Sequence, residues 1–287
     1  MRRWPPSGRT TAPTTRRSVT ERITARSGIP AARRIVVKVG SSSISGVNAG
    51  QIPKLVDALA RTHKRGADII LVSSGAIATG MPFLNLDSRP TDLATQQAAA
   101  AVGQNVLINR YQKSLDRYGI VAGQVLLTAG DLDNATSRSN AQRATERLLG
   151  LRILPIVNET DTVATHEIRF GDNDRLAALV SVLVSADLLV LLSDVDALYT
   201  RPPAEQGASR IENVPLGDPL AGVTFGNAAA SGVGTGGAGT KVAAARLAAA
   251  SGTAVLLTAT HRVADGLEGA DIGTWFEAGA RPPARRA

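Results

Sequence analysis

The sequence contains no cysteine, and only 3% of its 287 residues are aromatic. The absence of cysteine excludes a disulfide framework, a cysteine nucleophile and a thiolate metal site. It also fits a reducing compartment, so we expect a cytoplasmic protein. The low aromatic content argues against a surface of stacked rings for binding single-stranded nucleic acid. The core must therefore be built from Ala, Val, Leu and Ile.

Several familiar functional signatures are missing as well. No apolar run approaches the roughly 20 residues that span a bilayer, so we expect no membrane partner. There is no G-x-x-x-x-G-K-[ST] phosphate loop and no G-x-S-x-G nucleophile elbow. His63, His166 and His261 lie far apart without metal-ligand spacing, and we expect them at the surface. Residues 232–237 match G-x-G-x-x-G, but no strand pattern precedes them, which argues against a dinucleotide site.

The net charge of +8 is concentrated at the amino terminus. Residues 1–34 hold nine of the 32 basic and one of the 24 acidic residues, which leaves 23 of each in the remainder. The rest of the chain is therefore neutral, and its charge indicates no nucleic-acid-binding face. Because residues 1–33 are rich in Arg, Thr, Ser and Pro, we expect a disordered tail; a transit peptide is the alternative.

From Arg34 onward, strand and helix patterns alternate along the chain. Short apolar or β-branched runs predict strands at 35–39, 68–72, 120–127, 152–157, 187–192 and 254–257. Apolar residues at helical spacing predict helices between them, at 51–65, 91–117 and 241–250. This alternation predicts an α/β protein, a three-layer αβα sandwich with a mostly parallel central sheet.

No linker divides the first two hundred residues, so we expect one domain over residues 34–278 and a frayed end at 279–287. Residues 201–238 are rich in Gly and Pro, and we expect them to form loops around a site. Polar segments stand at the carboxyl ends of the predicted strands, at residues 40–43, 73–75, 158–161 and 193–194. Ligands bind beyond this edge in open α/β sheets, so a functional site is expected there.

Two lysines stand where a phosphate group could bind. Lys38 lies inside an apolar strand just before Gly40–Ser43. It either snorkels to solvent or faces a phosphoryl group beside the backbone N–H groups of that loop. Residues 235–241 open the last predicted helix with glycines and Lys241. They form either an anion site at a helix amino terminus or a flexible surface loop.

Acidic residues accompany these lysines. Asp161, Asp194 and Asp196 end or follow predicted strands, and Asp172 or Asp174 could cap the helix predicted at 175–185. Two lysines and several carboxylates, without a suitable His or Cys, indicate phosphoryl transfer from a Mg²⁺-nucleotide, which depends on positioning and charge neutralisation. A carboxylate acceptor fits this set, because it is already an anion and needs no general base.

These segments resemble the amino acid kinase family from about residue 34 to Phe276. Residues 36–42 resemble its opening strand and loop, and residues 72–78 resemble its second loop. Six further segments, in order, are similar to the members that phosphorylate glutamate: 101–104, 123–128, 155–163, 170–174, 192–200 and 236–241. The resemblance implies ATP-dependent phosphorylation of the γ-carboxylate of L-glutamate to L-glutamyl 5-phosphate, the first step of proline synthesis.

The resemblance also implies roles for individual residues. Lys38 and Lys241 would stabilise charge on the phosphoryl group, and Asp174 would hold both lysines in place. The implied glutamate-binding residues are Ser74, Asp161 and Asn173. The implied ATP-binding residues are Lys38, Ser193, Asp194, Thr235, Gly236, Gly237, Ala238, Gly239, Thr240 and Lys241. Mg²⁺ would be carried by ATP, with no protein ligands of its own.

The family further implies a homodimer or tetramer, inhibition by proline at the glutamate site, and hand-over of the acyl phosphate to glutamyl phosphate reductase. The sequence departs from the family at Thr160, where Asn is usual, and at Ala238, where many members have Met. It also stops too soon after Phe276 for the carboxy-terminal PUA domain of many bacterial members. Two alternatives are a family kinase acting on acetylglutamate, aspartate, carbamate or UMP, and a non-catalytic regulatory paralogue. Residues 155–174 argue against the first alternative, and the intact lysines and carboxylates argue against the second.

Overall fold

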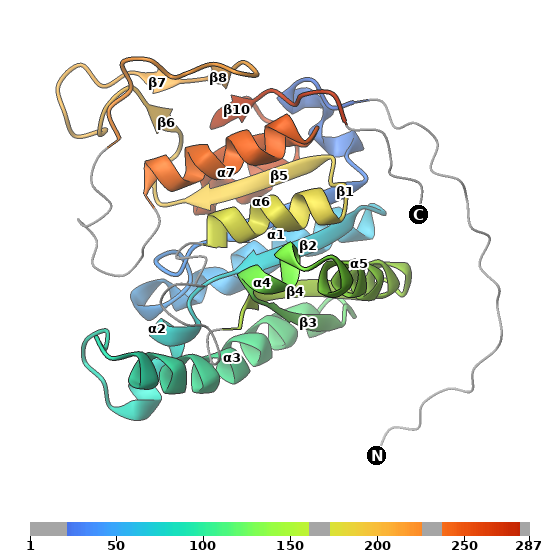
Figure 1. The fold of residues 1–287 in the computed structure, drawn as a ribbon, viewed down its shortest axis with the longest axis vertical. Coiled ribbons are helices and arrows are strands. Elements are labelled where there is room, and N and C mark those ends of the chain that lie inside the picture. The colour runs from blue at the N-terminus through green and yellow to red at the C-terminus, as the bar shows by residue number, and fades with distance from the viewer. Residues whose placement is uncertain (1–21, 161–172, 226–236, 282–287) are drawn as a thin grey trace.

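The computed structural model describes residues 22–160, 173–225 and 237–281. In these ranges, eight strands form one sheet in the order β3-β4-β2-β1-β5-β9-β10-β8 (Figure 1). The strands are β1 (Arg34–Val39), β2 (Asp68–Ser73), β3 (Ala122–Leu127), β4 (Leu154–Glu159), β5 (Leu188–Ser193), β8 (Asn213–Val214), β9 (Ala254–Ala259) and β10 (Thr274–Phe276). Neighbours from β3 to β9 are parallel, whereas β10 runs antiparallel to β9. The mostly parallel sheet expected from the sequence is confirmed.

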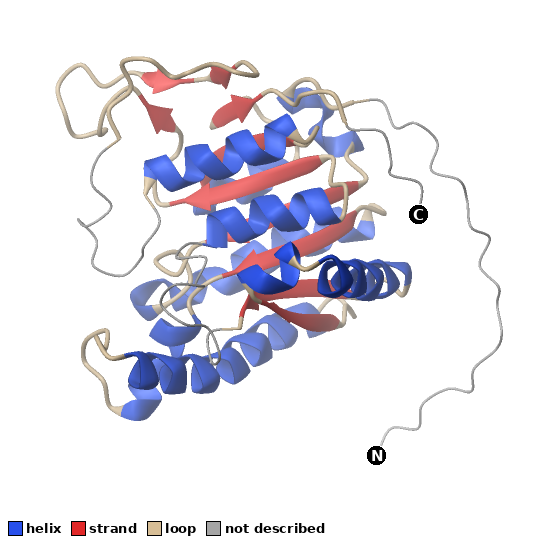
Figure 2. Ribbon diagram, in the orientation of Figure 1, coloured by secondary structure: helices blue, strands red, loops and turns tan. Residues whose placement is uncertain are grey.

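Helices cover both faces of the sheet (Figure 2). The helices are α1 (Ile52–Lys64), α2 (Ala76–Gly80), α3 (Leu93–Asp116), α4 (Ala129–Asp133), α5 (Ala135–Gly150), α6 (Asn173–Leu183), α7 (Ala238–Ala250) and α8 (Val263–Leu267). The short 3-10 turns are η1 (Arg26–Ala31), η2 (Gly46–Gln51), η3 (Met81–Leu84) and η5 (Thr260–Arg262). Among the described residues, no helix is long and apolar enough to cross a membrane.

Two apolar cores hold the three layers together, one on each face of the sheet. Ile35 and Val37 of β1 pack in one core with residues of α1, α3 and α8. Val36 points to the opposite core, which contains residues of α5, α6 and α7. Because β1 is buried on both faces, its sequence is a continuous apolar run rather than an alternating one. The only charged residues in that strand are Arg34 and Lys38.

The helices begin and end where local side chains favour it. α1 has a proline in its first turn and basic residues in its last turn, and both complement a helix at those ends. Asp92 caps α3 by accepting a hydrogen bond from the Thr95 backbone N–H at 2.8 Å. These signals agree with the apolar spacing, so the predicted helices lie close to the observed ones.

The expectation of a disordered tail over residues 1–33 is wrong for residues 22–33. Ile23 and Ile29 are buried there, and Arg26 is only 9% exposed. The Arg26 guanidinium donates to the backbone oxygens of Ile272 at 2.8 Å and Gly273 at 3.1 Å, beside β10. The polar composition of this segment does not predict its order, because the order depends on one arginine that binds several carbonyl groups and on two buried isoleucines. Residues 1–21 lie outside the described ranges.

Three other expectations need correction. Residues 279–281 are not frayed, since Gly279 N–H donates to Ala249 O at 2.7 Å and Arg281 Nη2 donates to Ala186 O at 2.7 Å. The region expected to be loops contains β7 (Arg210–Ile211), which pairs with β6 (Leu198–Tyr199), as well as β8. His63 is buried rather than at the surface. Residues 226–236 and 282–287 lie outside the described ranges.

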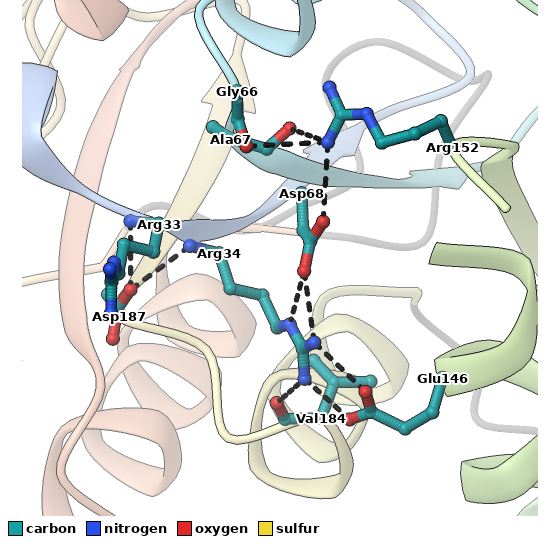
Figure 3. Close-up of polar contacts among 9 residues, drawn as sticks. All are labelled: Arg33, Arg34, Gly66, Ala67, Asp68, Glu146, Arg152, Val184 and Asp187. Carbon is teal, nitrogen blue, oxygen red and sulfur yellow. Dashed lines mark hydrogen bonds and ion pairs between the residues drawn. The ribbon is translucent and has the colours of Figure 1, made fainter. Parts of the chain in front are cut away.

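A charged cluster ties the layers together at the amino-terminal ends of the strands (Figure 3). Arg34 at the start of β1 is 6% exposed. Its guanidinium contacts Asp68 of β2 at 3.0 Å, Glu146 of α5 at 2.5 Å and the Val184 backbone oxygen at 2.7 Å. Hydrogen bonds to Glu146 and Asp68 raise the pKa of Arg34 despite its burial. One arginine thus links two strands, α5 and the turn after α6.

Candidate active site

The polar segments predicted to form a site do lie at one edge of the sheet. β1, β2, β4 and β5 are parallel, and the segments after them leave the sheet at the carboxyl ends (left in Figure 1). The amino ends of α6 and α7 reach the same edge. Asp174 in the first turn of α6 contacts Lys38 near the end of β1, and Lys241 in the first turn of α7 contacts Asp174. Asp161 lies outside the described residues.

Lys38, Asp174 and Lys241 form one buried cluster at this edge. Lys38 Nζ lies 2.5 Å from Asp174 Oδ1, and Lys241 Nζ lies 2.9 Å from Asp174 Oδ2. The Asp174 side chain has no exposed surface, and those of Lys38 and Lys241 are 3% and 10% exposed. The alternative that Lys38 snorkels to solvent is therefore wrong. Asp174 is also more than a helix cap, because it holds two cations.

The charges of this cluster suit an anionic ligand. Two ammonium groups share one carboxylate, so the three side chains together carry an excess of positive charge. An excess charge is unfavourable in a water-poor environment unless a counter-charge approaches. A phosphoryl group passing between two oxygens is such a counter-charge, and fixed cations stabilise it without having to reorganise.

The amino terminus of α7 adds to this positive potential. Gly237 precedes the helix in an extended conformation, and Lys241 lies in the first turns. Thr240 Oγ1 lies 2.9 Å from Gly237 O and 3.4 Å from Asp174 Oδ2. The first N–H groups of a helix have no partner within the helix, and they favour anions. For residues 237–241, the alternative of a flexible surface loop is wrong; Thr235 and Gly236 lie outside the described ranges.

An amide cluster joins the ends of β2 and β4 to α6. Asn173 Nδ2 lies 2.8 Å from Asn158 Oδ1, 2.9 Å from Ser73 O and 3.0 Å from Ser74 Oγ. Ser74 and Asn173, two of the predicted substrate-binding residues, are thus brought into contact. Asn158 begins the polar segment 158–161 expected at the site, but no individual role was predicted for it.

Tyr111 of α3 lies beneath this cluster. Its hydroxyl is 2.9 Å from Ser73 Oγ, and burial raises the pKa of Tyr111 well above its usual value, so the group stays neutral. α3 also touches α2 very closely, because a Cβ on Gly103 would lie 1.8 Å from Ala76 O. Only glycine fits at this position, and the close contact between the two helices packs the turn after Ser74 against α3.

Asp194 contacts the loop that follows β1. Its Oδ2 accepts a hydrogen bond from Ser42 Oγ at 2.8 Å, and its Oδ1 accepts one from Ser43 Oγ at 3.0 Å. The neighbouring Ser193 Oγ accepts a bond of 3.4 Å from the Val195 backbone N–H. The predicted nucleotide-binding residues Ser193 and Asp194 therefore stand beside Gly40–Ser43. Sequence reasoning missed that Asp194 binds both serine hydroxyls.

No group of three or more His, Cys, Asp or Glu side chains that could hold a metal ion occurs in the described part of the chain. Mg²⁺ prefers phosphate oxygens and water together with one or two carboxylates, so a nucleotide-borne ion needs no such group. That Mg²⁺ arrives with ATP stays a prediction.

The site contains two lysines bound to one buried carboxylate, at the strand ends of an αβα sandwich. Phosphoryl-transfer enzymes use fixed cations of this kind. The chain belongs to the amino acid kinase family, whose pattern matches residues 33–258. It is 75% identical over 251 residues to glutamate 5-kinase from Clavibacter sepedonicus, covering 88% of this chain and 96% of that protein. It is 55% identical over 267 residues to glutamate 5-kinase from Streptomyces coelicolor, covering 91% and 71%.

A solved structure shows the same fold at low sequence identity. Carbamate kinase from Giardia lamblia bound to AMP-PNP superposes with a TM-score of 0.62 at 15% identity, over 87% of this chain and all of that one. This likeness supports the three-layer architecture and says nothing more about the substrate.

Proposed function

We propose that this chain transfers the γ-phosphoryl group of ATP to the γ-carboxylate of L-glutamate, which yields L-glutamyl 5-phosphate and ADP. The observation that carries the proposal is the pairing of Lys38 and Lys241 with the buried Asp174. Family membership supports ATP as the donor. The relatives named glutamate 5-kinase, at up to 75% identity, support glutamate as the acceptor.

The geometry supports a direct transfer. One oxygen of the glutamate carboxylate attacks the γ-phosphorus while the bond to the β–γ bridging oxygen breaks. The carboxylate is already ionised, so no side chain has to remove a proton. Lys38 and Lys241 would lie against the transferring group, and Asp174 would hold their ammonium nitrogens at a constant separation. Catalysis then rests on positioning and on fixed positive charge.

The other predicted site residues divide between the two substrates. Ser74 and Asn173 would bind glutamate, since they lie together at the ends of β2 and α6. Asp161 stays a prediction as the partner of the glutamate amino group. Residues 237–241 would contact the ATP phosphates through the amino end of α7, with Thr235, Gly236, Ser193 and Asp194 as further predicted ATP contacts.

Several finer expectations belong to the same proposal. A cytoplasmic location, a homo-oligomer, inhibition by proline, hand-over to glutamyl phosphate reductase and Mg²⁺ dependence all stay predictions. An acyl phosphate hydrolyses readily, so a site that excludes water, or a partner that accepts the product, would protect it.

A hydroxylamine assay tests the proposal directly. Acyl phosphates react with hydroxylamine, so the purified chain with ATP and Mg²⁺ should form hydroxamate from L-glutamate and not from N-acetylglutamate or aspartate. Lys38→Met and Lys241→Met should each lower the rate by a factor of about 10²–10³. Lys54→Met, at an exposed position of α1, is the matched control and should keep the normal rate. No glutamate-dependent hydroxamate from the wild-type chain would refute the proposal.

A further inference from the structure

The loop after β1 lies directly against Lys38. A Cβ on Gly40 would be 3.9 Å from Lys38 Nζ, so the backbone there faces the ammonium group. The loop is partly fixed by its own turn, with Ser45 N–H donating to Ser41 O at 3.0 Å and Asn48 Nδ2 donating to Ser42 O at 2.7 Å. Its position therefore decides where a phosphate would meet both the backbone and Lys38.

The loop also binds Asp194, the residue that follows β5. Asp194 accepts hydrogen bonds from the hydroxyl groups of Ser42 and Ser43 at 2.8 and 3.0 Å. A carboxylate can only accept, so both serine hydrogens point to Asp194. Each hydroxyl has one hydrogen, and the Ser43 oxygen is left with lone pairs that only an external donor can engage.

Thr260 is that donor. It begins η5 immediately after β9. Its single hydroxyl hydrogen has Ser43 Oγ as its nearer acceptor, at 2.9 Å, and Ser193 O as a second and weaker one, at 3.2 Å. The two hydrogen bonds from Thr260 to Ser43 and from Ser43 to Asp194 connect the carboxyl ends of β9, β1 and β5. Thr260 belongs to none of the individual segments quoted for the family resemblance, and it lies beyond the matched residues 33–258.

We propose that Thr260 is a positioning residue for the nucleotide-phosphate site, acting through Ser43 and Asp194 on the loop Gly40–Ser43. The inference rests on the proposed function, because it assumes that this loop binds ATP phosphates. Loss of the Thr260 hydroxyl leaves Ser43 without its donor and lets the loop move relative to Lys38. Ser43 is itself bound to the Asp194 carboxylate, and loss of a hydrogen bond of this kind should weaken nucleotide binding about 10-fold.

The variant Thr260→Val keeps the shape of the side chain and removes the hydroxyl. We expect it to raise the KM for ATP about 10-fold and to leave the KM for glutamate within about 2-fold. Thr260→Ser should restore the wild-type KM for ATP, because it keeps the hydroxyl. Calorimetric titration with a non-hydrolysable ATP analogue and Mg²⁺ should show the same roughly 10-fold loss without requiring turnover.

Thr258→Val is the matched control. Thr258 lies near the end of β9, two residues before Thr260, and is fully buried. In the described part of the chain its hydroxyl has no hydrogen-bond partner, so its removal should leave both KM values unchanged. If Thr260→Val does not fold, Thr260→Ala and Ser43→Ala take its place, and each should weaken analogue binding. Combining Ser43→Ala with Thr260→Ala should add no loss beyond that of Ser43→Ala alone, because Thr260 acts on the loop through Ser43.

An unchanged affinity of Thr260→Val for the analogue would overturn the inference. So would an equal loss in Thr260→Ser, or an equal rise in both KM values. A wild-type chain that binds the analogue but forms no glutamyl hydroxamate would refute the proposed function alone, and the calorimetric comparison would still test Thr260.

Discussion

The ammonium nitrogen of Lys38 lies 2.5 Å from Oδ1 of Asp174, a side chain with no exposed surface. An aspartate so deeply buried is stable only because cations offset its desolvation. Lys241 binds the other carboxylate oxygen at 2.9 Å. The same contacts that make burial of the carboxylate tolerable also hold two ammonium groups at a fixed separation, which is what a phosphoryl group requires.

Replacing Asp174 by Asn should separate structure from charge. The amide keeps the shape of the carboxylate but cannot neutralise two ammonium groups, so Lys38 and Lys241 should repel each other and move. We expect kcat to fall by a factor of about 10²–10³ and the free energy of unfolding to fall by about 3–5 kcal/mol. The hydroxamate assay and urea unfolding measure the two effects. Asp265→Asn, in a half-exposed pair with Arg262, is the control and should change little. Normal turnover in the Asp174 variant would contradict the role given to this carboxylate.

Arg34→Met should lower stability without changing substrate binding. The substitution removes contacts to Asp68, Glu146 and the Val184 oxygen (Figure 3). Asp68 and Glu146 are 26% and 42% exposed and can rehydrate, so we expect a loss of only about 2 kcal/mol. Denaturant unfolding measures this loss. Both KM values should stay normal, because the cluster lies at the opposite edge of the sheet; altered KM values would show that β1 shifts as a whole.

Arg26→Met should show that the folded domain begins before Arg34. The side chain donates to the backbone oxygens of Ile272 and Gly273, which would otherwise be left without these donors near β10. We expect a loss of about 2 kcal/mol, or a fall in Tm of about 4–8 °C. Arg22→Met, which removes an exposed contact to Ala278 O, should lower Tm less. Equal Tm values for Arg26→Met and the wild type would show that residues 22–33 do not contribute to the stability of the domain.

His63 should make stability depend on pH. Burial, and then the nearby Arg152, lower the pKa of His63 below its usual value of 6.5, while Asp68 opposes the shift. The unfolded chain therefore takes up a proton as pH falls below about 6.5, before the folded chain does. Stability from this group is complete above that pH and is lost on acidification towards the folded-state pKa.

Unfolding free energies measured between pH 7.5 and pH 5 test this expectation. His63→Leu should flatten the decline, because the unfolded chain then gains no proton at this position. His261→Gln, at an exposed position, is the control and should leave the slope unchanged. An identical slope in wild type and His63→Leu would show that other groups control the acid response.

Much of the fold could be predicted because its signals are local. The β-branched run of β1 and the apolar stripe of α1 are set by neighbours within a few residues, and their bounds were close to those observed. Residues 22–33 were misjudged because their order depends on Arg26 reaching carbonyl groups near β10, far along the chain. His63 was misjudged for a similar reason, since its place on α1 does not reveal what covers the end of that helix.

The components of the fold and of the site can be found in the amino-acid sequence alone: an alternating α/β pattern, a lysine inside the first strand, a second lysine at a glycine-rich helix start, and polar residues at the strand ends. Three contacts become visible only in the folded protein: both lysines bind the same Asp174, Asn158 orients Asn173, and Thr260 and Asp194 meet at Ser43. Local patterns depend on residues a few positions apart. The contacts of the site join strand ends and helix starts that are separated by whole crossover connections, and only the packed sheet brings them together.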